Sequence, residues 1–118
     1  NERRQVIARR YRDGISNPSV EIPQIRPGCT HVFHLFPVLC GERDALAHHL
    51  AEKGVGTSIH YPIPPHLQKC YARLGYQPGD FPLSERYADC ELSLPIYAEM
   101  EDEEVAYVIE AVNSFGAE

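Results

Sequence analysis

The sequence predicts a small α/β domain of the α+β kind, in which helices pack on one face of a few-stranded, mainly antiparallel sheet. Two observations lead to this prediction. Helical and strand-like segments alternate along the chain, and prolines or glycines separate them. The 118 residues suffice for one domain, and 43% apolar and 24% charged residues are ordinary for a globular protein. Because one sheet face would stay free, we also expect a missing partner domain.

Residues 1–14 are expected to form a helix that connects this domain to another one. Asn1 can cap such a helix and Gly14 can end it. Its apolar stripe is narrow and consists of Val6, Ile7 and Tyr11. Arginines cover the remaining surface, so we expect the domain to hold this helix only weakly. Residues 15–118 would then form the small domain itself.

Extended segments are expected at three places in the first half of the chain. Residues 16–30 are rich in Pro and Gly, which predicts a loop with a short strand at 20–22. Residues 31–40 are almost continuously apolar, as in a buried strand, although Pro37 restricts that strand to an edge or a bulge. Residues 56–61 give a third short strand, and three nearby prolines end it.

The remaining segments are predicted to be helices, apart from a brief strand at residues 92–95. A helix over 42–53 places its apolar residues on one face. Two short helices are expected at 66–74 and 83–90. The helix over 101–114 is the clearest, because four apolar residues recur at i, i+3, i+4 and i+7 and acids crowd its start.

Charge and cysteine content argue against several classes of partner. A net charge of −6 does not suit a nucleic-acid backbone. Arginines crowd the first dozen residues and acids dominate 99–104, which we interpret as two solvated helix faces of opposite sign. No membrane span or signal peptide is recognisable, so we expect a cytoplasmic protein without a membrane partner. The four cysteines form no CxxC pair, which favours free, buried or half-buried thiols over zinc binding or disulfides.

The proline-rich turn after residues 56–61 is the segment best suited to binding chemistry. It brings imidazole, phenol and amide groups to a strand end, where loops commonly present ligand-binding side chains. These groups suit recognition of hydroxyl, carboxylate or phosphate groups. The same side chains could equally form hydrogen bonds within the core. The candidate substrate-binding residues are His60, Tyr61, His66 and Gln68, and we assign no catalytic, cofactor-binding or metal-binding residue.

Several short motifs follow one another in a fixed order. They are Gly54-Val55-Gly56-Thr57-Ser58-Ile59-His60-Tyr61-Pro62, Pro65-His66-Leu67-Gln68, Phe81-Pro82-Leu83-Ser84-Glu85-Arg86, Leu92-Ser93-Leu94-Pro95 and the acidic start of a terminal Val/Ile helix. Together they resemble the C-terminal part of the DegT/DnrJ/EryC1/StrS aminotransferases, which have the aspartate-aminotransferase fold (fold type I). Residues 1–11 are similar to the family's inter-domain helix, and residues 31–36 to the strand after it.

The resemblance implies a function for a longer protein. Members of this family use pyridoxal phosphate to transfer an amino group from glutamate to a keto-sugar on a nucleotide, for lipopolysaccharide, O-antigen, capsule or antibiotics. The His-Tyr-Pro motif is most similar to members that act on UDP-linked sugars for surface polysaccharide. It implies that His60 and Tyr61 contact the substrate at a homodimer interface, with His66 and Gln68 as further candidates and Glu85 as a structural anchor.

The same resemblance places the cofactor outside this chain. Pyridoxal phosphate requires a lysine and an acidic partner, and neither Lys53 nor Lys69 resembles the family's cofactor-binding lysine, which belongs to the large domain. Without that lysine, we expect the chain to be inactive alone. Its start at Asn1 without methionine suggests an excised piece of a longer chain. Two alternatives stay open. One is a stand-alone interaction or regulatory module with this fold, and the other is a sugar dehydratase of the same family.

Overall fold

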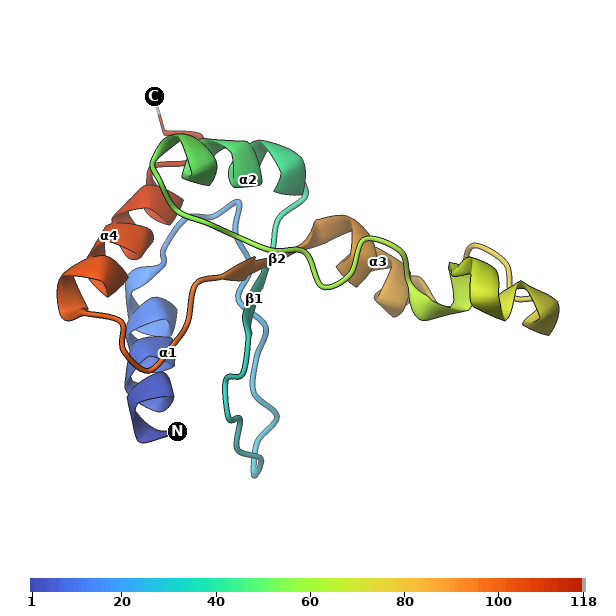
Figure 1. Ribbon diagram of the computed structural model, residues 1–118, viewed down its shortest axis with the longest axis horizontal. Helices are drawn as coiled ribbons and strands as arrows, with labels where there is room; N and C mark the ends of the chain where they lie inside the picture. Colours follow the sequence, from blue (N-terminus) through green and yellow to red (C-terminus); the bar gives the residue numbers. More distant parts are fainter. Residues whose placement is uncertain (118) are drawn as a thin grey trace.

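The computed structural model describes residues 1–117 and confirms an α+β domain with a small antiparallel sheet (Figure 1). Its elements in chain order are α1 (Glu2–Gly14), β1 (Phe36–Leu39), α2 (Arg43–Glu52), the 3₁₀ helices η1 (Pro65–Leu67) and η2 (Lys69–Leu74), α3 (Pro82–Cys90), β2 (Glu91–Leu94) and α4 (Asp102–Asn113). The four α-helices and β2 lie within about one residue of their predicted bounds. Within the described residues, no helix combines the length and apolar character that crossing a membrane demands.

The sheet consists of β1 and β2, which pair in antiparallel orientation over their full lengths. Single bridges extend the pair at either edge, from Glu21 to β1 and from Ser58 to β2. The strands predicted over residues 20–22 and 56–61 are therefore wrong in extent, since each is reduced to one bridged residue. Pro23, which has no backbone N–H to donate to a partner strand, follows residues 20–22. Within residues 56–61, the His60 N–H donates to the Glu91 side chain instead of to the backbone of a partner strand.

The strand predicted over residues 31–40 is shortened to β1, because side chains engage the backbone before it. Arg4 Nη1 donates hydrogen bonds to the carbonyl oxygens of Phe33 and His34, at 3.0 and 3.1 Å. The Phe33 N–H donates to His31 Nδ1 at 2.9 Å, and Phe33 has a φ of 51°. Backbone groups occupied in this way are not available for a strand partner.

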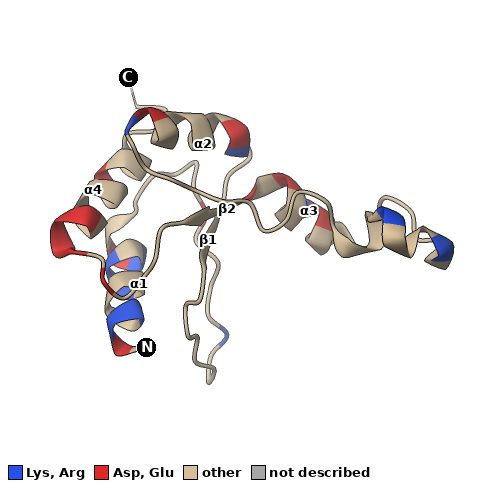
Figure 2. Ribbon diagram, viewed as in Figure 1, with Lys and Arg blue, Asp and Glu red and all other residues tan. Residues whose placement is uncertain are grey.

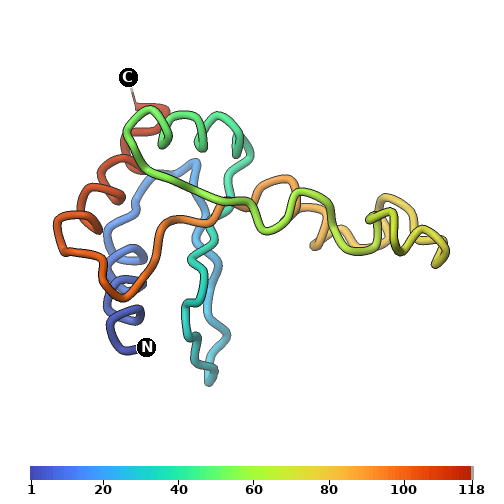
Figure 3. The backbone as a smooth tube through the Cα atoms, in the orientation of Figure 1, coloured from blue at the N-terminus to red at the C-terminus, as the bar shows by residue number. Residues whose placement is uncertain are grey.

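The helix predicted over residues 66–74 is two 3₁₀ helices instead of an α-helix. Pro65 begins η1, and Gln68, which separates η1 from η2, has an extended backbone with φ −71° and ψ 143°. With α3 these segments form a projection that we call the arm (residues 60–90), which extends away from α1, α2 and α4 (Figures 1 and 3). The radius of gyration of 15.6 Å exceeds the roughly 13–14 Å of a compact domain of this length, as a projection requires.

The helix α1 belongs to the hydrophobic core, so the expected weak attachment is wrong. Ile7, Ala8 and Tyr11 are completely buried, and α1 packs against α4 (Figure 1). The Tyr11 hydroxyl donates to the carbonyl oxygen of Pro95 at 2.6 Å. Ala8 adds to the apolar stripe of α1. Arg3 and Arg4 also hold the helix in place, because their guanidinium groups donate hydrogen bonds to backbone carbonyl groups outside α1.

The two oppositely charged helix faces meet each other, which corrects the expectation that both are merely solvated (Figure 2). Arg3 and Arg10 on α1 lie 2.9 and 3.1 Å from the Asp102 carboxylate at the start of α4. The Arg3 guanidinium, which hydrogen-bonds Asp102, holds the pKa of that carboxyl below its usual value. These ion pairs are exposed, so they orient α1 and α4 more than they stabilise the fold.

The four cysteines are free thiols, but the expectation that all are buried or half-buried is wrong for Cys29 and Cys70, and the difference gives a testable prediction. Cys29 and Cys70 are exposed, whereas Cys40 is buried, and burial raises the pKa of the Cys40 thiol. Since the thiolate is the reactive form, we expect iodoacetamide to label Cys29 and Cys70 in the native chain and to spare Cys40. Peptide mass spectrometry reads the sites, and labelling in denaturant is the control. Equally fast native labelling of Cys40 would contradict the burial.

Candidate functional site

The strand β2 separates an apolar side of the sheet from a polar one. Alternate residues of a strand point to opposite faces. Leu92 and Leu94 join the hydrophobic core, whereas Glu91 and Ser93 face the other way and contact each other. Glu91 is only 2% exposed and Ser93 only 4%. A carboxylate buried to this extent needs hydrogen-bond donors around it, and its donors define the site.

His60 completes a hydrogen-bonded group with these two residues, which we call the Glu91 cluster (Glu91, Ser93 and His60). The His60 backbone N–H donates to Glu91 Oε2 at 2.7 Å, and the Ser93 hydroxyl donates to Glu91 Oε1. The His60 ring is joined to Ser93 Oγ through Nδ1 at 2.9 Å. The peptide bond between His60 and Tyr61 is cis. The cluster therefore fixes both the backbone and the ring of His60 where the arm leaves the sheet.

Three of the four predicted site residues, His60, Tyr61 and Gln68, line one cavity of about 220 Å³, which we call the His60 cavity. The proline turn forms one part of its wall, and α3 adds Ser84 and Tyr87. Tyr61 is 67% exposed, and its ring centroid lies 5.3 Å from that of His60. Imidazole, phenol, amide and hydroxyl groups thus surround a hollow with apolar walls. Such a lining suits a neutral group rich in hydroxyls.

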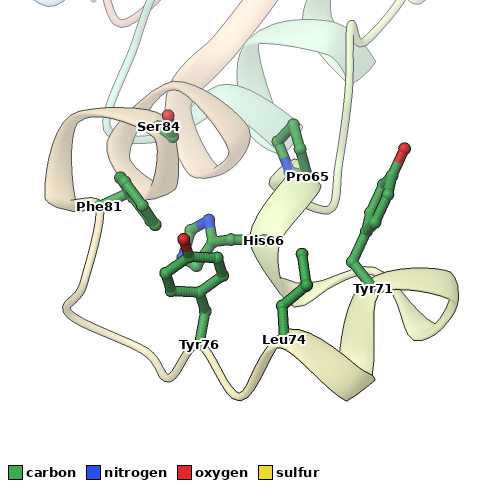
Figure 4. A pocket seen from close by; sticks show the side chains of 7 residues that line it. All are labelled: Pro65, His66, Tyr71, Leu74, Tyr76, Phe81 and Ser84. Atoms are coloured by element: carbon green, nitrogen blue, oxygen red, sulfur yellow. The ribbon is translucent and has the colours of Figure 1, made fainter.

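His66, the fourth candidate, lines a neighbouring cavity of about 300 Å³ that shares Pro65 and Ser84 with the first (Figure 4). Its buried Nε2 lies 3.4 Å from Glu85 Oε2 without a hydrogen bond. Its ring packs edge-on against Phe81, with the centroids 4.9 Å apart.

Glu85 anchors the loop that precedes α3 through hydrogen bonds to its backbone. Its Oε1 accepts the N–H of Gly79 at 2.8 Å, and its Oε2 accepts the N–H of Phe81 at 3.3 Å. These bonds agree with the anchoring role that the resemblance implied for Glu85.

Sequence reasoning missed Glu91 and Ser93. The apolar residues of this segment predict a strand over residues 92–95, which does not include Glu91. The strict alternation Glu91-Leu92-Ser93-Leu94 could have indicated a polar face opposite the core. What that face contacts could not have been read from it, since His60 lies 31 residues before Glu91.

The described residues do not fit pyridoxal phosphate on their own. Lys53 and Lys69 are both exposed, and neither lines the His60 cavity. The buried carboxylate, Glu91, is already engaged by His60 and Ser93. Residues 1–117 also contain no group of three or more His, Cys, Asp or Glu side chains that could hold a metal ion. No cofactor step is assigned to these residues.

Several relatives of the chain are named as sugar aminotransferases. It is 46% identical over 116 residues to the dTDP-3-amino-3,6-dideoxy-α-D-galactopyranose transaminase of Aneurinibacillus thermoaerophilus, an alignment that covers 98% of this chain and 31% of that protein. It is 32% identical over 108 residues to the UDP-N-acetyl-3-dehydro-α-D-glucosamine 3-aminotransferase of Acidithiobacillus ferrooxidans, with 92% and 29% covered. The chain thus spans about a third of the length of these relatives.

The fold agrees with this relationship. The structure of S. venezuelae DesV in complex with a ketimine intermediate superposes with a TM-score of 0.94 at 36% identity, covering 99% of this chain and 32% of that one. Residues 1–113 match the family model described as the DegT/DnrJ/EryC1/StrS aminotransferase family. Nearly the whole chain is included in that match, and the chain belongs to this aminotransferase family.

Proposed function

We propose that this chain is the substrate-binding small domain of a pyridoxal-phosphate-dependent aminotransferase that transfers an amino group from glutamate to a nucleotide-linked keto-sugar. The match of residues 1–113 to the family carries this proposal. The cofactor supplies the chemistry of amino transfer and is bound by the large domain outside this chain. Residues 1–14 connect to that domain, and residues 15–118 form the small domain of a cytoplasmic homodimer.

The sequence resemblance and the names of the relatives point to different nucleotides in the substrate. The His-Tyr-Pro motif favoured UDP and a product for lipopolysaccharide or other surface polysaccharide. The relative with 46% identity is named for a dTDP-sugar, whereas the one with 32% identity is named for a UDP-sugar. Since identity is higher to the first, we propose a dTDP-linked keto-sugar as the preferred substrate and keep the UDP-linked sugar as the competing prediction.

Contacts to the sugar are assigned to the residues of the His60 cavity. We propose that His60, Tyr61 and Gln68 bind sugar hydroxyl groups, because all three residues carry polar side chains and line one hollow. His66 contributes from the neighbouring cavity, across the wall formed by Pro65 and Ser84.

The proposal is tested by giving the full-length protein glutamate together with dTDP- or UDP-linked keto-sugar. Formation of 2-oxoglutarate and an amino sugar, measured by mass spectrometry, is the expected result, with the dTDP-sugar turned over faster. Loss of a sugar hydroxyl without consumption of glutamate would indicate the dehydratase instead. The 118-residue chain alone, mixed with pyridoxal phosphate, is expected to be inactive and to show no visible absorption of a lysine-bound cofactor.

In the full-length protein, His60→Ala and Tyr61→Phe are expected to raise the KM for the nucleotide sugar about 3- to 10-fold. Each removes a group that could hydrogen-bond the substrate, and one such bond is worth about 0.5–1.5 kcal/mol. Steady-state kinetics with varied sugar and saturating glutamate measure the effect. His48→Ala on the exposed side of α2 is the matched control and should leave KM unchanged. An unchanged KM in both site variants would remove these residues from the substrate contact.

A further inference from the structure

The hydrogen bonds of the Glu91 cluster determine where its protons lie. An ionised carboxylate only accepts hydrogen bonds. Glu91 Oε2 accepts the His60 N–H at 2.7 Å, and Oε1 accepts the Ser93 hydroxyl. The single hydroxyl hydrogen of Ser93 is used in that bond, so its oxygen must accept at the His60 contact of 2.9 Å. Nδ1 of His60 is then the nitrogen that carries the proton.

The other ring nitrogen of His60 follows from this assignment. A neutral imidazole has one protonated nitrogen, so Nε2 is left as a hydrogen-bond acceptor. Among the described residues, Nε2 has no hydrogen bond. The half-buried ring lines the 220 Å³ cavity beside Tyr61 and Gln68, and it also borders a hollow of about 130 Å³ beside Ser93. The group best matched to such a nitrogen is a hydrogen-bond donor on a ligand, and a keto oxygen is a poor match.

We propose that Glu91 and Ser93 are positioning residues that hold His60 in its Nδ1–H tautomer and thereby present Nε2 to a donating hydroxyl group of the sugar. The two residues act through His60 and line no part of the His60 cavity themselves. The identity of the ligand rests on the proposed function. The tautomer rests only on the geometry of the Glu91 cluster.

Glu91→Gln tests the chain of hydrogen bonds from Glu91 through Ser93 to His60, which we call the relay. The substitution preserves the shape of the side chain but reverses which partner donates in each hydrogen bond along the relay. The backbone N–H of His60 requires an acceptor, so the amide oxygen of the new residue must face it. The amide NH₂ then faces Ser93 and donates to Oγ. This frees the hydroxyl hydrogen of Ser93 to donate to Nδ1, which forces the proton onto Nε2. One isosteric substitution therefore turns the unbonded Nε2 of His60 from a hydrogen-bond acceptor into a donor.

The tautomer is measured without substrate in the full-length protein, by ¹⁵N NMR of histidine-labelled samples. His60→Gln identifies the His60 signals by their loss. We expect a protonated Nδ1 in the native protein, a protonated Nε2 in Glu91→Gln, and exchange between both forms in Ser93→Ala, in which the ring loses its partner. A protonated Nε2 in the neutral native ring, or the same tautomer in the native protein and in Glu91→Gln, would overturn the relay.

Kinetics then test the link to the substrate. Glu91→Gln is expected to raise the KM for the nucleotide sugar about 3- to 10-fold with little change in kcat, the loss of about one hydrogen bond. Glu110→Gln, an exposed change on α4, is the matched control with unchanged KM. A reversed tautomer with unchanged KM would refute the substrate contact but leave the relay standing. Should no keto-sugar be aminated, the proposed function fails while the NMR result still decides the relay.

Discussion

Tyr11→Ala is expected to lower the free energy of unfolding by about 3–5 kcal/mol, as for other large aromatic residues removed from a core. Tyr11 is completely buried, and its ring packs edge-on against Phe36 with the centroids 5.0 Å apart. Its hydroxyl donates to the Pro95 carbonyl at 2.6 Å, and burial raises the pKa of the phenol so that it stays a donor. Urea unfolding of the chain, followed by circular dichroism, measures the loss.

Tyr11→Phe separates the two contributions of this side chain. It keeps the packing but leaves the Pro95 carbonyl without its donor, which should cost about 1–3 kcal/mol. Val6→Ala is the control, because Val6 lies on the same helix and is 43% exposed. A loss below about 1 kcal/mol in Tyr11→Ala would contradict the placement of α1 in the core.

Arg4→Ala is expected to cost about 1.5–3 kcal/mol and to loosen the segment before β1, because Arg4 joins three parts of the chain. Its Nη1 donates to the carbonyl oxygens of Phe33 and His34 and to that of Ile96, all at about 3 Å. Urea unfolding measures the stability, and amide hydrogen exchange at Phe33 measures the loosening.

Arg4→Lys provides the comparison for this prediction. An ammonium retains the charge but lacks the planar guanidinium, so it should restore only part of the lost stability. Arg9→Ala is the control, because Arg9 is exposed on the same helix. If Arg4→Ala changed neither stability nor the exchange at Phe33, the short length of β1 would need another cause.

Local sequence patterns predicted the helices well and the strands less well. The apolar spacing and acidic start of residues 101–114 gave α4 almost to the residue. The strand expected over residues 31–40 failed because Arg4, far away in sequence, binds carbonyl groups that a strand would use. The helix expected over residues 66–74 failed because Pro65 and the extended Gln68 break it into 3₁₀ turns. Contacts between distant residues are not encoded in a local pattern.

The sequence predicted part of the candidate site. The prolines around His60 and Tyr61 marked a rigid turn, and the structure brings both side chains and Gln68 to one cavity. His66 was grouped with them by sequence proximity alone, but the turn directs it into the neighbouring cavity. The burial of Glu91 could not be predicted, because one of its two donors, the His60 N–H, lies on another segment, while the other, Ser93, is on the same strand.

The two ends of the arm meet on the same strand, which has a consequence for how this domain can diversify. The arm leaves the sheet just after Ser58, which bridges Ser93, and returns at Glu91, the first residue of β2. Doubling the length of such an excursion costs only about 0.6 kcal/mol of closure entropy. Insertions, deletions and exchanges between residues 61 and 81, before α3 returns to the sheet, can therefore accumulate without repacking the core. We expect this one contiguous segment to be transplantable between relatives as a unit, so that new sugar preferences could arise by recombination as well as by point mutation.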